Sequence, residues 1–176
     1  ILETTERIGT RKKLKGYLIT YFDKEYKKEL QLIVYTKNEI EEIKKNDDPI
    51  YLVGLDDPES TNNEQSYSIK ERLTRLTKET KSYTVLLSHR PEEFASYVDE
   101  ANLVLSGHTH GGQIRLPFIG AVIAPDQGFF PKYSDGIYKE GDTTMIISRG
   151  IGNSVIPIRI NNPAEIVVVT LKAKTG

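Results

Sequence analysis

The stretch YTVLLSHRPEEFASYVDEANLVLSGHTHGGQ, residues 83–113, holds two short apolar runs separated by a more polar segment. The runs Tyr83–Leu87 and Leu103–Leu105 have the length and composition of buried strands. Pro91 favours the first turn of a helix between them. Strand, helix and strand in this order predict α/β layering.

The segment before this stretch predicts a second unit of the same kind. Ile50–Leu55 (IYLVGL) is a buried strand by composition, and residues 56–65 are polar and predict a loop. Ser68–Lys81 carries apolar residues at helical spacing and opens with Ser68-x-x-Glu71, a helix-capping pattern. After the quoted stretch, Gly136–Ile147 predicts a hairpin and Glu165–Leu171 a terminal strand.

Residues 1–49 are rich in Lys and Glu and form a lead-in segment distinct from residues 50–176. Apolar residues recur there at every fourth position, which predicts one amphipathic helix: Leu14, Leu18, Phe22, Tyr26 and Leu30. Leu32–Tyr35 predicts a short strand, and residues 46–49 (NDDP) predict a turn.

Composition excludes several classes of site. The 176 residues carry a formal net charge of −1, which gives no footprint for nucleic acid. The absence of cysteine excludes disulfides and thiolate metal sites. No apolar run approaches the ~20 residues that span a bilayer. The chain begins with Ile1, so a preceding signal or anchor stays open, and so does the choice between the cytoplasm and the membrane or cell wall.

The three histidines of the chain all follow predicted strands. His89 comes directly after YTVLLS, and His108 and His110 follow LVLS. In an open α/β sheet, ligands bind beyond the carboxyl ends of the strands. In extended backbone, residues two apart point to one side, so His108 and His110 are expected to share a pocket while Thr109 points away. The three imidazoles therefore predict a metal site.

A His-x-His pair by itself is a weak signal, because cupin barrels and amidohydrolases also use it. A cupin needs a later histidine, and none follows His110. An amidohydrolase has its His-x-His early, with further histidines after it, which is the reverse of the order here. A single histidine after a strand is more often a surface residue than a ligand.

Residues 86–91 (LLSHRP) followed by residues 103–113 (LVLSGHTHGGQ) resemble the calcineurin-like metallophosphoesterases, in particular the bacterial branch that carries GHTHGGQ. That branch includes cell-wall-associated phosphodiesterases and enzymes resembling UDP-diacylglucosamine pyrophosphohydrolases. The resemblance covers about residues 50–172 and includes further stretches: GLDDP at 54–58, PKY at 131–133, GIY at 136–138, SRGIG at 148–152, PIR at 157–159 and PAEI at 163–166.

The resemblance implies the C-terminal half of a four-layer α/β/β/α sandwich that holds two divalent metal ions, Mn, Fe or Zn, with Mn favoured. It assigns His89 and His108 to the second metal and His110 to the first. The three early motifs of the family, Asp-x-His, Gly-Asp-x-x-Asp and Gly-Asn-His-Asp/Glu, are absent. The catalytic residue and the remaining ligands are therefore expected from an N-terminal half outside this sequence. Alone, the chain is expected to bind metal poorly and to be inactive, because stable sites have three or four protein ligands.

The complete enzyme would hydrolyse phosphate mono- or diesters with a hydroxide activated by the two metals. We expect Gly111, Gly112 and Gln113 to line the phosphate pocket, although the glycines alternatively serve only the turn after His110. Arg90 could contact a phosphate or pair with a carboxylate.

For four other charged residues a structural role is favoured over contact with substrate. They are the arginines that stand among apolar residues and glycine, and the aspartates that follow the first strand, for which loop capping is expected: Arg149, Arg159, Asp56 and Asp57.

Two other functions remain open from sequence. The absent motifs would also suit a non-catalytic interaction or regulatory module that keeps the phosphoesterase fold. The other open function is that of a simple metal-binding protein. The substrate, the oligomeric state and membrane or cell-wall proximity are not set by the sequence.

Overall fold

The computed structural model describes residues 2–4, 16–23, 28–35, 39–45, 48–57, 67–80, 82–152 and 158–172. The chain divides into two compact units. One comprises Ile1–Thr36 with Val167–Gly176, and the other comprises Lys37–Ile166. All three histidines lie in the second unit.

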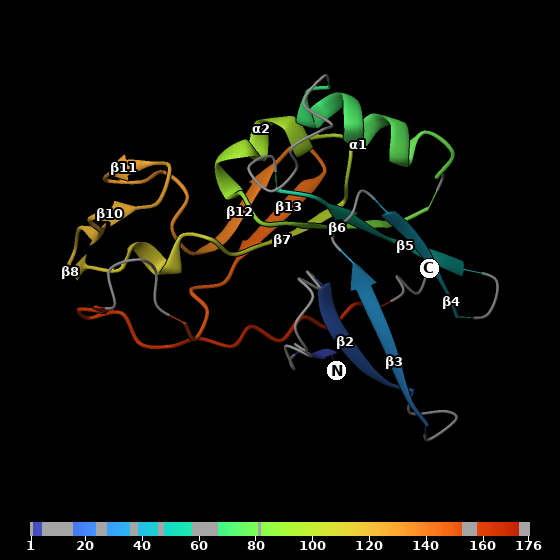
Figure 1. The fold of residues 1–176 in the computed structure, drawn as a ribbon, viewed down its shortest axis with the longest axis horizontal. Helices are drawn as coiled ribbons and strands as arrows, with labels where there is room; N and C mark the ends of the chain where they lie inside the picture. The colour runs from blue at the N-terminus through green and yellow to red at the C-terminus, as the bar shows by residue number, and fades with distance from the viewer. Residues whose placement is uncertain are drawn as a thin grey trace, which may run out of the picture. The chain divides into compact units, whose positions relative to one another are not determined.

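The second unit is built on a six-stranded mixed sheet (Figure 1). The strands run in the spatial order β12-β13-β7-β6-β5-β4. The four central strands are parallel to one another, and the two outer strands β4 and β12 are antiparallel to their neighbours. The bounds are β4 (Glu39–Lys45), β5 (Asp48–Leu55), β6 (Thr84–Ser88), β7 (Leu103–Ser106), β12 (Gly136–Glu140) and β13 (Thr143–Ile147).

Two helices connect the central strands and lie on one face of this sheet (Figure 1). Between β5 and β6 comes α1 (Ile69–Thr77), whose N-cap Ser68 and Glu71 form the predicted capping box. Between β6 and β7 a 3₁₀ turn (Pro91–Glu93) leads into the short α2 (Phe94–Tyr97). The predicted α/β class is confirmed, because strands and helices alternate through this part of the chain.

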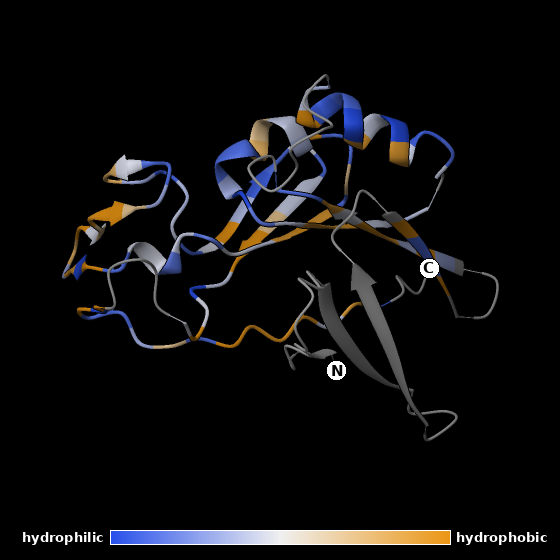
Figure 2. Ribbon diagram, viewed as in Figure 1, coloured by the Kyte–Doolittle hydropathy of each residue, from blue (hydrophilic) through white to orange (hydrophobic). Residues whose placement is uncertain are grey.

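The core lies between these helices and the sheet. Leu73 from α1 and Phe94 and Tyr97 from α2 pack with residues of the central strands that include Val53, Leu86, Val104 and Met145. Figure 2 shows apolar residues along the strands and polar residues over much of α1. The predicted strands at 50–55, 83–87 and 103–105, and the hairpin at 136–147, are all present.

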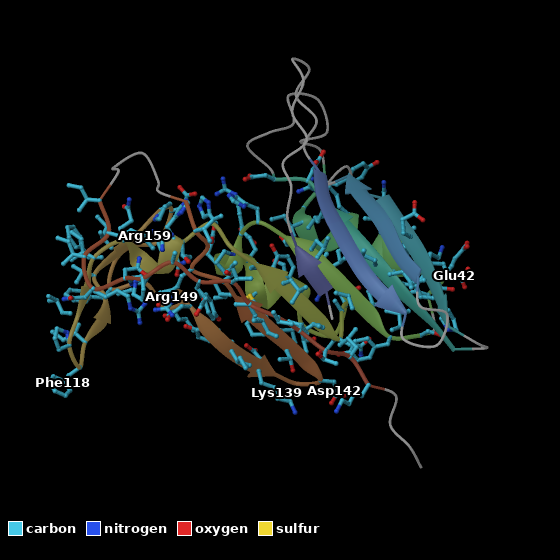
Figure 3. The ribbon with its side chains drawn as sticks, turned by 90° about the horizontal axis from the view of Figure 1, so that it is seen from below. Glu42, Phe118, Lys139, Asp142, Arg149 and Arg159 are labelled. Carbon is cyan, nitrogen blue, oxygen red and sulfur yellow. The ribbon has the colours of Figure 1, made fainter. Side chains whose placement is uncertain are left out.

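After β7 the chain forms a 3₁₀ turn (His110–Gly112) and two minimal antiparallel pairs. These are β8 (Arg115–Leu116) with β9 (Gly120–Ala121), and β10 (Ile123–Ala124) with β11 (Gly128–Phe129). Figure 3 labels Phe118 at the tip of the first pair, where its side chain is fully exposed.

The first unit is a three-stranded antiparallel sheet of β1 (Leu2–Thr4), β2 (Gly16–Asp23) and β3 (Lys28–Tyr35). The predicted helix through residues 14–30 is therefore wrong, while the strand predicted at 32–35 is the end of β3. A spacing of four residues also keeps side chains on one face of a strand, where the period is two. The β-branched and aromatic residues of YLITYF at 17–22 favour the strand. Leu14 and Tyr26 lie outside the described residues.

The terminal strand predicted at Glu165–Leu171 is also wrong, because residues 162–172 have no regular secondary structure. Apolar composition favours a strand only where a neighbouring strand offers backbone partners. Residues 46–47 of the predicted turn and residues 58–65 of the predicted loop lie outside the described residues. Among the described residues, no helix has the length and apolar character that a bilayer crossing requires.

Candidate metal centre

The parallel strands bring the histidine-bearing loops to one edge of the sheet. Leu55 at the end of β5 is aligned with Ser88 at the end of β6, and Leu87 of β6 is aligned with Leu105 of β7. His89 follows β6 directly, and His108 lies two residues beyond β7. Their side chains therefore start from neighbouring strand ends.

The rings of His89 and His108 meet at this edge. The Nε2 atom of His89 lies 2.8 Å from the Nδ1 atom of His108. The ring centroids are 4.5 Å apart, with an angle of 64° between the planes. Two imidazole nitrogens that face each other can share a proton or, when the proton is displaced, a metal ion.

A carboxylate holds the other nitrogen of His108. Asp126 Oδ2 lies 2.7 Å from His108 Nε2, and the same oxygen accepts a hydrogen bond of 2.9 Å from Nη1 of Arg90. The Nε atom of Arg90 donates to Asp57 at 2.8 Å. The guanidinium therefore joins the loops that follow β5 and β6 to the turn that carries Asp126.

His110 is held by the chain that returns to this edge near its C-terminal end. The side-chain amide of Asn162 donates to the carbonyl of His110 at 2.6 Å, and Asn162 is almost fully buried. The Nδ1 atom of His110 lies 3.3 Å from the carbonyl oxygen of Gly152. Arg159 donates to the same carbonyl oxygen.

The pKa values of His89 and His110 are lowered, which favours their neutral form. Burial lowers the pKa of His89, and the positive charges of His108, Arg90 and His110 lower it further, against the opposing effect of Asp57. Burial also lowers the pKa of His110, although the contact with Gly152 opposes the shift. Neutral imidazole is the form that binds a metal. The donor set therefore suits divalent ions that accept nitrogen and oxygen ligands.

The backbone of the His-x-His segment is not extended, contrary to the expectation. His108 and His110 have φ values of 67° and 49°, and Thr109 between them is helical at φ −69°. Thr109 does point away from the histidines, because its buried hydroxyl donates to the carbonyl of Ser134 at 2.6 Å. Left-handed backbone at two non-glycine residues is strained, and such strain gathers at functional sites.

Gly111 and Gly112 are buried and also left-handed, at φ 67° and 73°. A Cβ on Gly111 would lie 2.5 Å from Asn162 Oδ1 and 2.6 Å from Arg149 Cγ, and one on Gly112 would overlap Ala121. This tight packing agrees with the second expectation for these glycines, namely that they serve the turn after His110. Gln113 is buried beside them with φ 40°.

The arginines are paired with protein groups. Arg90 contacts Asp57 and Asp126, in agreement with the expectation that it pairs with a carboxylate. The loop-capping role of Asp57 stays a prediction. Arg149 forms an ion pair of 2.8 Å with Glu165, and Arg159 donates to the carbonyl of Arg149. Figure 3 labels both arginines. The structural role predicted for Arg149 and Arg159 is thus confirmed.

Sequence reasoning missed two acidic residues at this edge, Glu92 and Asp126. Ligand atoms of Glu92, His108 and Asp126 all lie within 4.8 Å of one another. Glu92 follows His89 by only three residues, a proximity that could have drawn attention to it. Asp126 stands 16 residues after His110 in a Pro-Asp-Gln-Gly turn, where only the fold brings it back.

An open cavity of about 470 Å³ lies at the opposite edge of the sheet. Its lining includes Thr84 and Thr143, the first residues of β6 and β13, and Asn102 just before β7. Its lining contains none of the histidines. The cavity is therefore separate from the histidine site at the carboxyl ends of the strands.

Several curated proteins resemble this chain in sequence. An uncharacterized metallophosphoesterase of Bacillus subtilis, YkuE, is 42% identical over 102 residues, which are 57% of this chain and 34% of that protein. An uncharacterized metallophosphoesterase of Aquifex aeolicus is 37% identical over 54% of this chain and 35% of its own length. The phosphodiesterase YaeI of Escherichia coli is 34% identical over 49% of this chain and 32% of its own length.

The chain thus spans about a third of the length of these relatives. No protein-family model matches the chain, and no solved structure matches it. The relatives' names agree with the resemblance inferred from the histidine motifs.

Proposed function

We propose that this chain is part of a metal-dependent phosphoesterase that hydrolyses phosphate mono- or diesters at a dinuclear centre. The observation that carries the proposal is the pair of imidazole nitrogens, His89 Nε2 and His108 Nδ1, 2.8 Å apart at neighbouring strand ends. Relatives named metallophosphoesterase and phosphodiesterase support it.

In this proposal His89 and His108 hold the second metal and His110 the first. Both sites use neutral imidazole nitrogen, which suits Mn, Fe or Zn, and Mn is favoured. When bound, two divalent ions supply an activated water and neutralise charge on the phosphate. The three early motifs of the resembling family are absent from residues 1–176, so the proposal takes the other ligands and the catalytic residue from an N-terminal half outside this sequence. Together the two halves would form a four-layer α/β/β/α sandwich.

The other predicted site residues orient the substrate. The guanidinium of Arg90 would contribute positive charge beside His89 while it keeps its ion pair with Asp57. Gly111, Gly112 and the Gln113 side chain would line the phosphate pocket. The N–H group of Gly112 donates to the carbonyl of Thr109 at 2.7 Å, so it would reach a phosphate only by sharing or breaking that hydrogen bond. Because the glycines pack against Asn162, Arg149 and Ala121, we expect them to contribute through backbone atoms alone.

A hydrolysis assay tests this proposal. The natural full-length protein, loaded with Mn, is expected to cleave bis(p-nitrophenyl) phosphate or p-nitrophenyl phosphate, and a chelator is expected to abolish the rate. His108→Ala removes one of the two facing nitrogens and is expected to lose most of the activity. Lys139→Ala, on an exposed position of β12, is the matched control and should keep it. Full activity in His108→Ala would refute the assignment.

The competing function is a non-catalytic module that keeps the fold. It predicts no hydrolysis of either ester with Mn, Fe or Zn in a protein whose circular dichroism shows that it is folded. A metal-binding protein without hydrolytic activity would give the same kinetic result but tight uptake of metal in calorimetry. The subcellular localisation of the protein is a separate question. Cell fractionation would distinguish the cytoplasm from a membrane or the cell wall.

A further inference from the structure

We propose that Asp126 is a positioning residue that fixes His108 in the tautomer with the proton on Nε2, so that Nδ1 is its metal-binding atom. The metal-binding part of this inference rests on the proposed function. The tautomer itself is a property of the chain without metal and can be tested separately.

The first step is the contact between His108 and Asp126. A carboxylate has acceptor sites only, so a contact of 2.7 Å between Asp126 Oδ2 and His108 Nε2 requires the proton on the ring nitrogen. The neutral imidazole then carries its lone pair on Nδ1. That atom faces Nε2 of His89 at 2.8 Å, so both rings can direct lone pairs at the same space once His89 carries its own proton on Nδ1.

The second step is the restraint on Asp126. Its side chain is about 40% exposed, so packing alone does not fix its orientation. Arg90 fixes it through a hydrogen bond of 2.9 Å to the same oxygen that contacts His108. The Arg90 side chain is 11% exposed and also pairs with Asp57, while its carbonyl accepts a 2.9 Å hydrogen bond from the buried hydroxyl of Tyr97. An aspartate, a histidine and a metal in line is the arrangement by which proteins orient ligating imidazoles.

A rival arrangement uses the same residues differently. Glu92, His108 and Asp126 could themselves surround a cation, because their ligand atoms lie within 4.8 Å of one another. That arrangement needs the lone pair on Nε2, the opposite tautomer. It also puts the cation beside the guanidinium of Arg90, which lies 2.9 Å from Asp126 and 3.5 Å from Glu92. Like charges at such distances repel, so the positioning role is favoured.

Nitrogen-15 NMR of the histidine rings distinguishes the two tautomers. In the natural full-length protein without metal, we expect His108 to show a protonated Nε2 and an unprotonated Nδ1, with His108→Gln identifying its signals. In Asp126→Ala we expect a mixture of both tautomers. Asp126→Asn should keep the wild-type tautomer, because Arg90 and His108 both donate to Oδ2, which the amide oxygen can replace.

Zinc titration against a chromogenic chelator gives the second readout. We expect Asp126→Ala to weaken Zn²⁺ binding about 10- to 100-fold and Asp126→Asn to restore most of the affinity. Asp135→Ala removes a different aspartate that pairs with an arginine, Arg115, and should change neither readout. A wild-type His108 protonated on Nδ1, or an Asp126→Ala variant with unchanged tautomer and Zn²⁺ affinity, would overturn the inference. Absence of hydrolysis together with the expected tautomer would refute the proposed function and leave the tautomer assignment intact.

Discussion

Gly107 precedes His108 and Gly111 follows His110. Substitution of alanine should affect stability differently at these two glycines. Gly111→Ala places a Cβ 2.5 Å from Asn162 Oδ1 at a backbone φ of 67°, whereas nothing lies within 4 Å of a Cβ at Gly107. We expect Gly111→Ala to lower the free energy of unfolding by about 1–3 kcal/mol. Urea denaturation of both variants checks this, and equal stability of the two would contradict it.

Tyr97 is a fully buried phenol whose hydroxyl contacts both neighbours of His89. It lies 2.7 Å from Ser88 Oγ and donates to the carbonyl of Arg90 at 2.9 Å. Tyr97→Phe removes both contacts, and we expect a loss of about 1–3 kcal/mol in unfolding free energy. Tyr83→Phe alters an exposed ring and serves as the matched control.

The stability difference between the wild type and Tyr97→Phe should also depend on pH. Burial raises the pKa of Tyr97 above its ordinary value of about 10. Above that value the unfolded wild-type chain ionises at this residue while the folded protein does not, so the wild type loses stability and Tyr97→Phe does not. Denaturation midpoints measured from neutral to alkaline pH should therefore converge. A constant difference would show that the phenol titrates normally.

Single residues also mark the limit of what could be predicted for the site. A common edge of the sheet could be predicted for His89, His108 and His110, because each follows a strand that the local sequence indicates. Asp126 was missed, because its contact with His108 spans 18 residues and depends on the β10–β11 turn. The backbone of Thr109 was predicted as extended, and the burial of its hydroxyl against Ser134 could not be known beforehand.

Among the helices and strands, the capping box of α1 offers a direct test. Ser68 Oγ accepts from the backbone N–H of Glu71, and the carboxylate of Glu71 accepts from the backbone N–H of Ser68. Ser68→Ala should destabilise the protein by about 1 kcal/mol, measured by thermal or urea unfolding. Ser82→Ala changes a serine that caps no helix and should have little effect. A loss of equal size in Ser82→Ala would show that the cap contributes nothing of its own.

The elements that were predicted correctly are those whose local signals agree with their surroundings. The parallel strands β5, β6 and β7 are buried and apolar, and α1 has a cap at its start. The wrong predictions concern segments whose secondary structure depends on whether a neighbouring strand is available for backbone pairing. The four-residue spacing of Leu18 and Phe22 fits a helix as well as the β2–β3 pair, and the apolar run at 165–171 has no strand partner among the described residues.

For the molecule as a whole, metal binding should appear as added stability. If the proposed centre exists, a ligand that binds only the folded protein stabilises it by about 2.7 kcal/mol at 100 times its dissociation constant. The melting temperature of the natural full-length protein should thus rise with Mn or Zn concentration and return after chelation. His108→Ala should show no such rise, while Lys139→Ala should follow the wild type. An equal rise in His108→Ala would locate the binding elsewhere.

The hydrogen bond from Asn162 to the carbonyl of His110 joins residues 52 positions apart. A nascent chain that has left the ribosome only as far as Gly112 already contains every histidine but lacks this clamp. We therefore expect the loop that carries His110 to reach its final shape only after residue 162 has been synthesised, later than the β12–β13 hairpin. On this expectation, the speed of translation would influence when this edge of the sheet is completed.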